Sequence, residues 1–453
     1  MGNLFKLHLE DASGEPTEGA VPAGGLDESE TATAEIADLR QEEAEIVEAD
    51  GEAERLDDNV ELAEDLAAEV EPVVTEGLGL DKAGMAILLT GMRAIAGRKH
   101  AHIVGKNVKM EAIDAGASGR AEQTKIVFED LKDTLKSAWA AIKAAFKKAW
   151  AKIKTWYIKT FDASKKLKSR AESVRTRAEG TSATIDKKTF SFSGAKTLAV
   201  DGSLKDGSKF VTALGRVKTL SGQILDTVKS EQVGKNAEAL ADLLGTVEDG
   251  KVDSALSTIE AGIVASAGVK GLSGGVSDAK VKASLGDAKE IDVQASEELP
   301  GGKLIVNVKG KGGSSTAEKI AQIRRTRTAF VNAKDKQKEV ASEVGTLTAS
   351  QVANLAETVI EIADEIFDFK KGWENRDRDQ DKIIAAIDKA FAEIGKNKEA
   401  STAGQRNARG LASAATGLLR RDAAFKSTFV SYALNVCNVA LSYGEGSLRQ
   451  HKK

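Results

Sequence analysis

The stretch LKSAWAAIKAAFKKAWAKIKTWYIKTF, residues 135–161, carries the main signal for the fold of this chain. It continues an apolar stripe that starts at Phe128 and ends at Phe161, nine steps over 33 residues and a mean spacing of 3.67. Such an eleven-residue repeat is typical of a straight or slightly right-handed helical seam. We therefore predict one long amphipathic helix over about residues 124–179, with the stripe packed against a partner helix and Trp156 at its edge. The stripe comprises Phe128, Leu131, Leu135, Trp139, Ile142, Phe146, Trp150, Ile153, Tyr157 and Phe161.

The same helix is strongly cationic. Residues 132–170 hold 12 Lys and Arg against two acids. Clustered bases can neutralise nucleic-acid phosphates without reading sequence, whereas lysines opposite an aromatic face also fit a helix lying on a membrane surface. Both alternatives stay open beside simple helix packing. The predicted phosphate contacts are Lys143, Lys147, Lys148, Lys152, Lys154, Lys159, Lys165, Lys166, Lys168 and Arg170, with Arg324 and Arg325 in a second basic patch.

Charge is divided unevenly along the chain. Residues 1–80 contain 24 Asp and Glu against three Lys and Arg, a net charge of −21, and the remaining 373 residues carry +17. Three of the four prolines also lie in this acidic leader. Residues 10–35 have the composition of a disordered segment, and residues 34–71 predict an acidic helix interrupted at Gly51. A leader of opposite charge would suppress binding of the basic body to nucleic acid until it is removed.

The predicted fold class is mainly α. We expect a disordered acidic N-terminus and leader (1–70), a basic helical region with the long amphipathic helix (71–185), a small α+β domain (186–312) and a C-terminal helical bundle (313–453). In the α+β domain, helices are expected near 208–229 and 235–246, and the alternating segments 187–194 and 303–310 predict strands that pair with each other. The bundle helices are expected at 316–344, 350–371, 376–396, 400–419 and 422–443, with Cys437 in the core.

Little in the sequence points to catalysis. One cysteine excludes an internal disulfide, and four histidines leave scant material for acid–base chemistry. The loop KGKGGSS (residues 309–315) matches no phosphate-binding motif, and we expect Ser or Thr to cap the next helix there. Asp377, Asp379 and Asp381 have calcium-loop spacing, but the required glycine is replaced by Lys382. We therefore expect no enzyme, cofactor or metal, and an enzyme built on the middle domain is the third alternative.

The apolar start MGNLFKLHLE, the acidic leader and the helix WAKIKTWYIKTFDASKKLKSRAESVRTRAE resemble the internal head proteins of phiKZ-type giant tailed bacteriophages over residues 1–180. The resemblance implies a virion protein made in the bacterial cytoplasm, packaged inside the capsid with genomic DNA and other interior proteins, and ejected with the genome. It also implies cleavage by a head-maturation protease after a small residue, any residue and Glu. That pattern occurs at Ala67, Ala68 and Glu69 and again at residues 13–15. The alternative is a membrane-active protein masked by its acidic segment.

Overall fold

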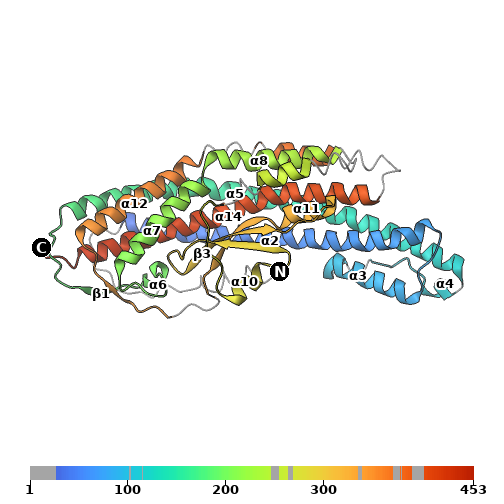
Figure 1. The fold of residues 1–453 in the computed structure, drawn as a ribbon, viewed down its shortest axis with the longest axis horizontal. Helices are drawn as coiled ribbons and strands as arrows, with labels where there is room; N and C mark the ends of the chain where they lie inside the picture. The colour runs from blue at the N-terminus through green and yellow to red at the C-terminus, as the bar shows by residue number, and fades with distance from the viewer. Residues whose placement is uncertain are drawn as a thin grey trace.

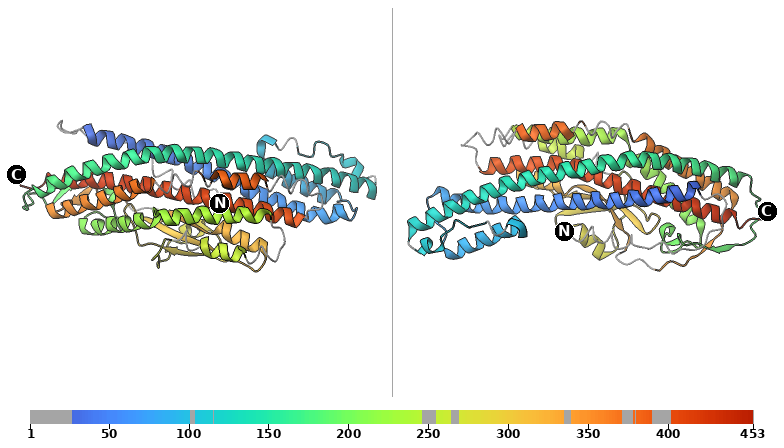
Figure 2. Two further views of the ribbon diagram at one scale, coloured as in Figure 1. Left: turned by 90° about the horizontal axis from the view of Figure 1, so that it is seen from above. Right: turned by 180° about the vertical axis from the view of Figure 1, so that it is seen from behind.

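The computed structural model describes residues 27–100, 104–114, 116–245, 255–263, 269–334, 339–370, 378, 380–389 and 402–452. Most of these residues are helical, and the longest helices run side by side along one axis, which makes the molecule elongated (Figures 1 and 2). The prediction of a mainly α fold is confirmed.

The long amphipathic helix is α5, which spans Ala117–Glu179, about 95 Å at 1.5 Å per residue. It begins seven residues before the predicted start and ends where predicted, before Gly180. Every described side chain of the predicted stripe is at most 6% exposed, so the stripe is a packed seam. The side chains of Leu135 and Trp139 lie outside the described part of the chain.

The main partner of α5 along this seam is the acidic helix α2, Asp27–Thr75 (Figure 2). Ile36, Leu39 and Ile46 of α2 are buried in the same core cluster as Trp150 and Tyr157 of α5. The composition of α2 explains its helicity, since alanine and glutamate are strong helix formers. The predicted leader is therefore part of the folded body.

Two expectations about the leader are wrong. Residues 27–35, predicted to be disordered, form the first turns of α2, while residues 10–26 lie outside the description. The helix also continues through Gly51 and includes Pro72 near its end. A glycine in a helix interior costs about 1 kcal/mol, and burial of Ala49 and Ala53 on either side of Gly51 outweighs that cost.

Helices α12 (Ala349–Asp368) and α14 (Thr402–Leu448) complete the bundle against α5, and α14 also packs on α2. A capping box of Thr348 and Gln351 starts α12, whose position agrees with the prediction. The two helices expected at 400–419 and 422–443 are one, because Arg420 at the expected break is buried and bonded inside the fold. Residues 378 and 380–389 of the segment expected at 376–396 are helical, and Cys437 is buried as expected.

Shorter helices cover the other side of the bundle. α7 (Gly207–Ile224) begins at the cap Asp206 and packs on α12, and α8 (Thr227–Asp242) begins at the cap Asp226 and packs on α14. They correspond to the helices expected at 208–229 and 235–246, but the break between them lies closer to the N-terminus, at residues 225–226. Other short helical segments in this part of the chain are α6 (Ala195–Leu198), the 3-10 turn η1 (Leu243–Gly245), residues 255–263 and α10 (Ala279–Leu285).

A three-stranded antiparallel sheet lies against the bundle in the order β2 (Ile291–Ala295), β3 (Lys303–Gly310), β4 (Arg327–Asn332). α11 (Thr316–Arg325) connects β3 to β4 and packs on α14. A separate two-stranded sheet joins β1 (Thr189–Ser191) to β5 (Glu343–Gly345).

The predicted pairing of the segments 187–194 and 303–310 is therefore wrong, because each strand finds its partner elsewhere. The helix expected at 316–344 is also wrong beyond Arg325. Residues 327–332 instead extend as β4, which pairs with β3 and buries Phe330 and Val331.

α3 (Lys82–His100) and α4 (Met110–Asp114) form a small lobe against the first half of α5, within the region 71–185 that was expected to be helical. Met85 and Met92 of α3 share a second core cluster with Val127 and Leu131 of α5. The largest cluster, by contrast, takes side chains from all four predicted domain ranges. The division into those domains stays a prediction.

Candidate functional site: the basic face of α5 and its acidic neighbour

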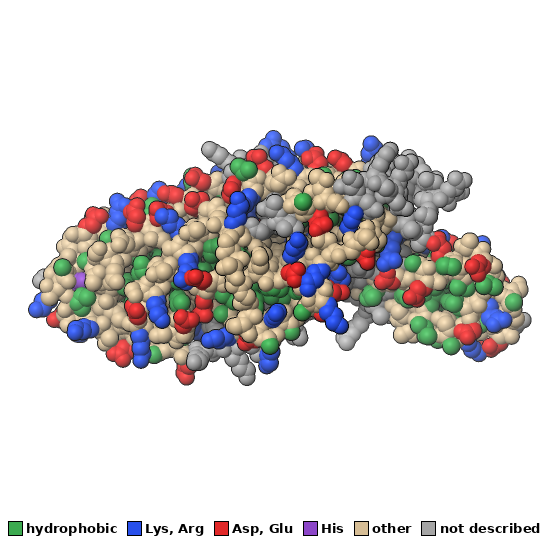
Figure 3. All heavy atoms as spheres, viewed as in Figure 1, with side chains coloured by type: hydrophobic (Ala, Val, Ile, Leu, Met, Phe, Trp, Pro, Cys, Tyr) green, Lys and Arg blue, Asp and Glu red, His purple; other side chains and the backbone are tan. Residues whose placement is uncertain are grey.

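The outer surface of α5 carries a basic face. Between residues 147 and 166, six lysines are exposed, and the only exposed acid in that interval is Asp162. Because the stripe turns inward, the lysines turn outward at the same helical period. Figure 3 shows Lys and Arg side chains on another face of the molecule mixed with Asp and Glu rather than gathered by sign. The exposed lysines are Lys147, Lys148, Lys154, Lys159, Lys165 and Lys166.

Two lysines along α5 are ion-paired with the acidic helix α2. Lys152 Nζ lies 2.7 Å from Glu45 Oε2, and Lys159 Nζ lies 3.3 Å from Asp38 Oδ2 and also contacts Glu42. The hydrogen bond from Lys152 lowers the pKa of Glu45, and those to Glu42 and Asp38 raise the pKa of Lys159. Each exposed pair contributes little to stability by itself, but together they place the acidic surface of α2 directly beside the basic face.

Further along the bundle, α2 also forms ion pairs with α14. Arg406 of α14 contacts Asp65 of α2, and Arg420 of α14 contacts Asp50. The second pair is buried, with 6% and 8% of the two side chains exposed. The opposite charges that are separated in the sequence are thus partly joined in space. No local signal could have revealed the buried pair, because its members are 370 residues apart.

Other predicted phosphate contacts are engaged elsewhere. Lys143 pairs with Asp388 at 2.6 Å and Lys168 with Asp364 at 2.8 Å, both at the edges of the basic face. Arg170 is 5% exposed and donates to side chains of α14, namely Asn438, Ser442 and Glu445. Its position in the fold makes it a link between α5 and α14.

Arg324 and Arg325 lie at the end of α11, on a different part of the molecule from the basic face. Arg325 Nη2 is 3.1 Å from Glu290 Oε1, and the backbone carbonyl of Arg324 accepts a hydrogen bond from Arg421. The structure therefore brings together the lysines of α5 but does not bring these two arginines to them.

The predicted cleavage residues Ala67, Ala68 and Glu69 lie inside α2. Ala67 is 4% exposed in the cluster that α2 shares with α3 and α5, and Glu69 faces solvent. A protease that binds its substrate in an extended form would have to unwind this turn. The second candidate, residues 13–15, lies outside the described part of the chain.

The loop between β3 and α11 caps a helix. Ser315 accepts a hydrogen bond from the Glu318 amide, and the Glu318 carboxylate accepts one from the Ser315 amide, which forms a capping box. This confirms the capping interpretation of that loop. Asp377 and Asp379 lie outside the description, and the described residues contain no group of three or more His, Cys, Asp or Glu side chains placed to hold a metal ion.

Within the described ranges, no helix combines the length and the apolar character needed to cross a bilayer. Fold and surface together define a long helical protein in which a basic helix and an acidic helix lie side by side. The family model described as phiKZ-like phage internal head proteins matches residues 41–446, and the chain belongs to that family. The match extends far beyond residue 180, and membership implies a place inside the phage head. Searches of curated proteins and of solved structures found no match.

Proposed function

We propose that this protein is packaged with genomic DNA inside the head as a non-enzymatic, sequence-independent DNA-binding protein, and that α2 restrains the binding until maturation. The observation that carries the proposal is the ion pairing of Lys152 and Lys159 on the basic face with the acidic helix α2. Five more lysines of the same face are exposed, namely Lys147, Lys148, Lys154, Lys165 and Lys166.

Long-range electrostatics supports the same role for α2. Binding to DNA is driven by the release of counterions from phosphates, and its strength falls with each acid that lies near the binding face. Besides the paired acids, Glu48 and Glu52 of α2 are exposed. A chain made in the bacterial cytoplasm would then be held back from binding nucleic acid before packaging.

Processing by the head-maturation protease is the second part of the proposal. A cut after Glu69 divides α2 near its end, and residues 27–69 still hold Leu39 and Ile46 in the core. Cleavage therefore leaves the restraining acids docked at first, and the restraint ends when the cleaved segment leaves the body. Ejection of the matured protein with the genome remains part of the proposal. Mass spectrometry of the protein from purified particles tests the processing, and an intact N-terminus would contradict it.

The DNA-binding test neutralises the paired acids and leaves the fold whole. In the double variant Glu42→Gln and Glu45→Gln, Lys152 is released and the hold on Lys159 is weakened. We expect tighter binding to a labelled duplex, measured by fluorescence anisotropy over a range of salt. Up to two released lysines should steepen the slope of log affinity against log salt by about 2.

The matched control is Glu48→Gln with Glu52→Gln, which changes the net charge equally at two exposed positions of the same helix. It should strengthen binding less, because these acids hold no lysine of the basic face in the ion pairs described. Equal affinities and equal salt slopes for the two double variants would contradict the restraint. Salt-insensitive binding by the whole protein would contradict phosphate binding itself.

A further inference from the structure

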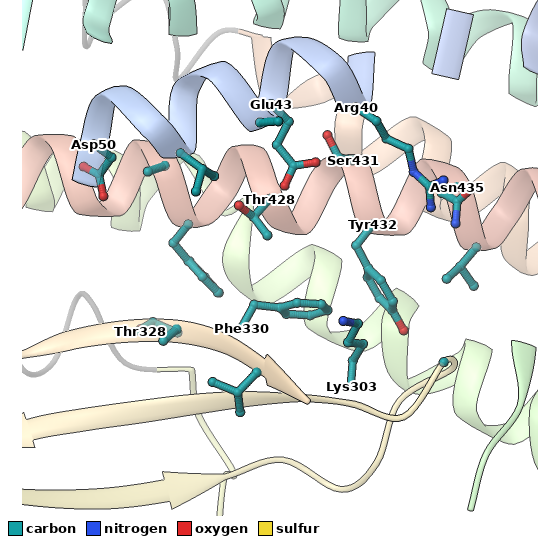
Figure 4. Close-up of a pocket in the computed structure, with 18 of the residues that line it drawn as sticks. Arg40, Glu43, Asp50, Lys303, Thr328, Phe330, Thr428, Ser431, Tyr432 and Asn435 are labelled. Carbon is teal, nitrogen blue, oxygen red and sulfur yellow. The ribbon is translucent and has the colours of Figure 1, made fainter. Parts of the chain in front are cut away.

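A cavity of about 350 Å³ lies where α2, α14 and the three-stranded sheet meet (Figure 4). Its volume falls at the lower end of the range of small-molecule sites, roughly 300–1,000 Å³. One wall is α2, the second is α14, and the floor is β4 with the start of β3. It lies apart from the exposed lysines of α5, none of which lines it.

The apolar part of the lining is centred on two rings. Phe330 of β4 and Tyr432 of α14 have ring centroids 4.7 Å apart. Val47 of α2 and Phe425 of α14 also line the space. The Tyr432 hydroxyl donates to the Pro300 carbonyl at 2.9 Å, which orients its ring within the wall. A ring or a short alkyl chain of a ligand would be buried here.

The charged part of the lining has an excess of cations. Five basic residues line the cavity against three acids, and one of those acids, Asp50, is already paired with Arg420. Lys303 Nζ donates a hydrogen bond to Asn332 Oδ1 at 2.5 Å. In Figure 4 its ammonium end lies beside Phe330 and Tyr432. The basic residues are Arg40, Lys196, Lys303, Arg327 and Arg421.

Glu43 is one of the three acids that line this space, and all three belong to α2. Its carboxyl group lies beside the hydroxyls of Thr428 and Ser431 of α14 in Figure 4. Burial raises its pKa to about 7, against the lowering by those hydroxyls and by the charges of Arg40 and Lys303. Near neutral pH this group is therefore partly a neutral hydrogen-bond donor, and it adds little negative charge to the lining.

We propose that this cavity binds a small amphipathic anion, with its apolar part against Phe330 and Tyr432 and its negatively charged head toward Lys303. Carboxylate and phosphate heads share this chemistry. Because α2 supplies one wall, such a ligand binds only the form of the protein in which α2 is docked. By linkage it stabilises that form, and it would hold the acidic helix in place independently of what α5 binds.

The probe for the test is anilinonaphthalene sulfonate, an aromatic anion that fluoresces when it is buried. The full-length protein should bind one probe molecule per chain with saturation. Lys303→Met should weaken binding at least tenfold. Lys309→Met, at the exposed end of the same strand, should leave it unchanged. Circular dichroism and thermal melting establish that each variant is folded. Absence of saturable binding, or equal loss in both variants, would overturn the proposal.

Competition identifies the head group. Decanoate and decyl phosphate should each displace the probe, and the tighter competitor names the preferred head. Neutral decanol should displace it at least tenfold less well. If decanol competes as well as decanoate, the site is merely apolar and the proposed role of Lys303 is wrong. Val47→Trp, which fills the space from α2, should abolish probe binding while the chain stays helical.

The pH dependence tests the geometry around Glu43. Below pH 7 its carboxyl group is mostly neutral, and above pH 7 it is mostly negative and repels the anionic head. The groups that act on it are Arg40 from α2, Thr428 and Ser431 from α14, and Lys303 from β3. Probe affinity should therefore fall between pH 6 and pH 8 in the native protein. Glu43→Gln should remove most of that fall, and an unchanged fall in the variant would show that Glu43 does not face the ligand.

Discussion

Two ion pairs between α2 and α14 differ in burial, and burial decides how much each contributes to stability. Asp50 and Arg420 are 8% and 6% exposed, and Arg420 also donates to the Asp50 carbonyl. Burial raises the pKa of Asp50, and the adjacent guanidinium group opposes that shift. Asp65 and Arg406 are 50% and 38% exposed, so water screens their attraction.

At this scale we predict that Asp50→Ala lowers the free energy of unfolding by about 3–5 kcal/mol, because it leaves the Arg420 charge buried and unpaired. Asp65→Ala, on the same helix with the same type of partner, should cost less than about 1 kcal/mol. Urea unfolding followed by circular dichroism measures both. Similar losses in the two variants would show that the Asp50 pair is as well hydrated as the exposed one.

Helix α5 has an inward apolar face and an outward basic face, and the helical period of its sequence keeps the two apart. Trp150 and Tyr157 point inward and are 3% and 0% exposed. Trp156, expected at the edge of the stripe, is also fully buried, because α2 covers a second side of the helix and the Trp156 indole donates to the Leu39 carbonyl at 3.1 Å. Because all three side chains pack against protein, the helix has no aromatic face left for lipid at these positions.

For this element we predict that Trp150 and Trp156 are shielded without lipid. In a variant with Trp139→Phe and Trp373→Phe, only these two indoles emit. Their emission should be blue-shifted in buffer, resist quenching by acrylamide, and stay unchanged when anionic vesicles are added. Emission typical of exposed indole that shifts to the blue only with vesicles would support the membrane alternative instead.

The whole molecule is held together across the predicted boundary between leader and body. α2 packs on α5 and α14, shares ion pairs with both, and forms a wall of the cavity. The connection from α2 to α3 is a short segment, residues 76–81, that is mostly exposed. Breaking that connection removes no contact of the α2 seam.

We therefore predict that cleavage at a protease site engineered into residues 76–81 leaves the two pieces associated. They should elute together in size-exclusion chromatography at low salt and at 1 M salt, since the apolar seam survives when surface ion pairs are screened. They should separate in urea. Dissociation at low salt straight after cleavage would mean that α2 is held by the chain rather than by its packing.

The sequence by itself determined the elements whose signals are local. The stripe and its period located α5 and its inward face, a capping pattern located the start of α11, and apolar periodicity located α12 and the buried Cys437. Exposure of the lysines between residues 147 and 166 followed from the same period. Such signals lie within one or two helical turns, where propensity and capping act.

Only the tertiary structure decided which segments meet. The continuity of α2 through Gly51, the strand β4, the burial of Arg170 and the pairing of Asp50 with Arg420 all depend on partners far away in the chain. The spacing of apolar residues shows that one face of a helix is buried, but it does not show which segment covers that face. The stabilising free energy of packing comes from burying both apolar surfaces together. For that reason the acidic leader, which looked separable, proved to be the partner that the stripe of α5 required.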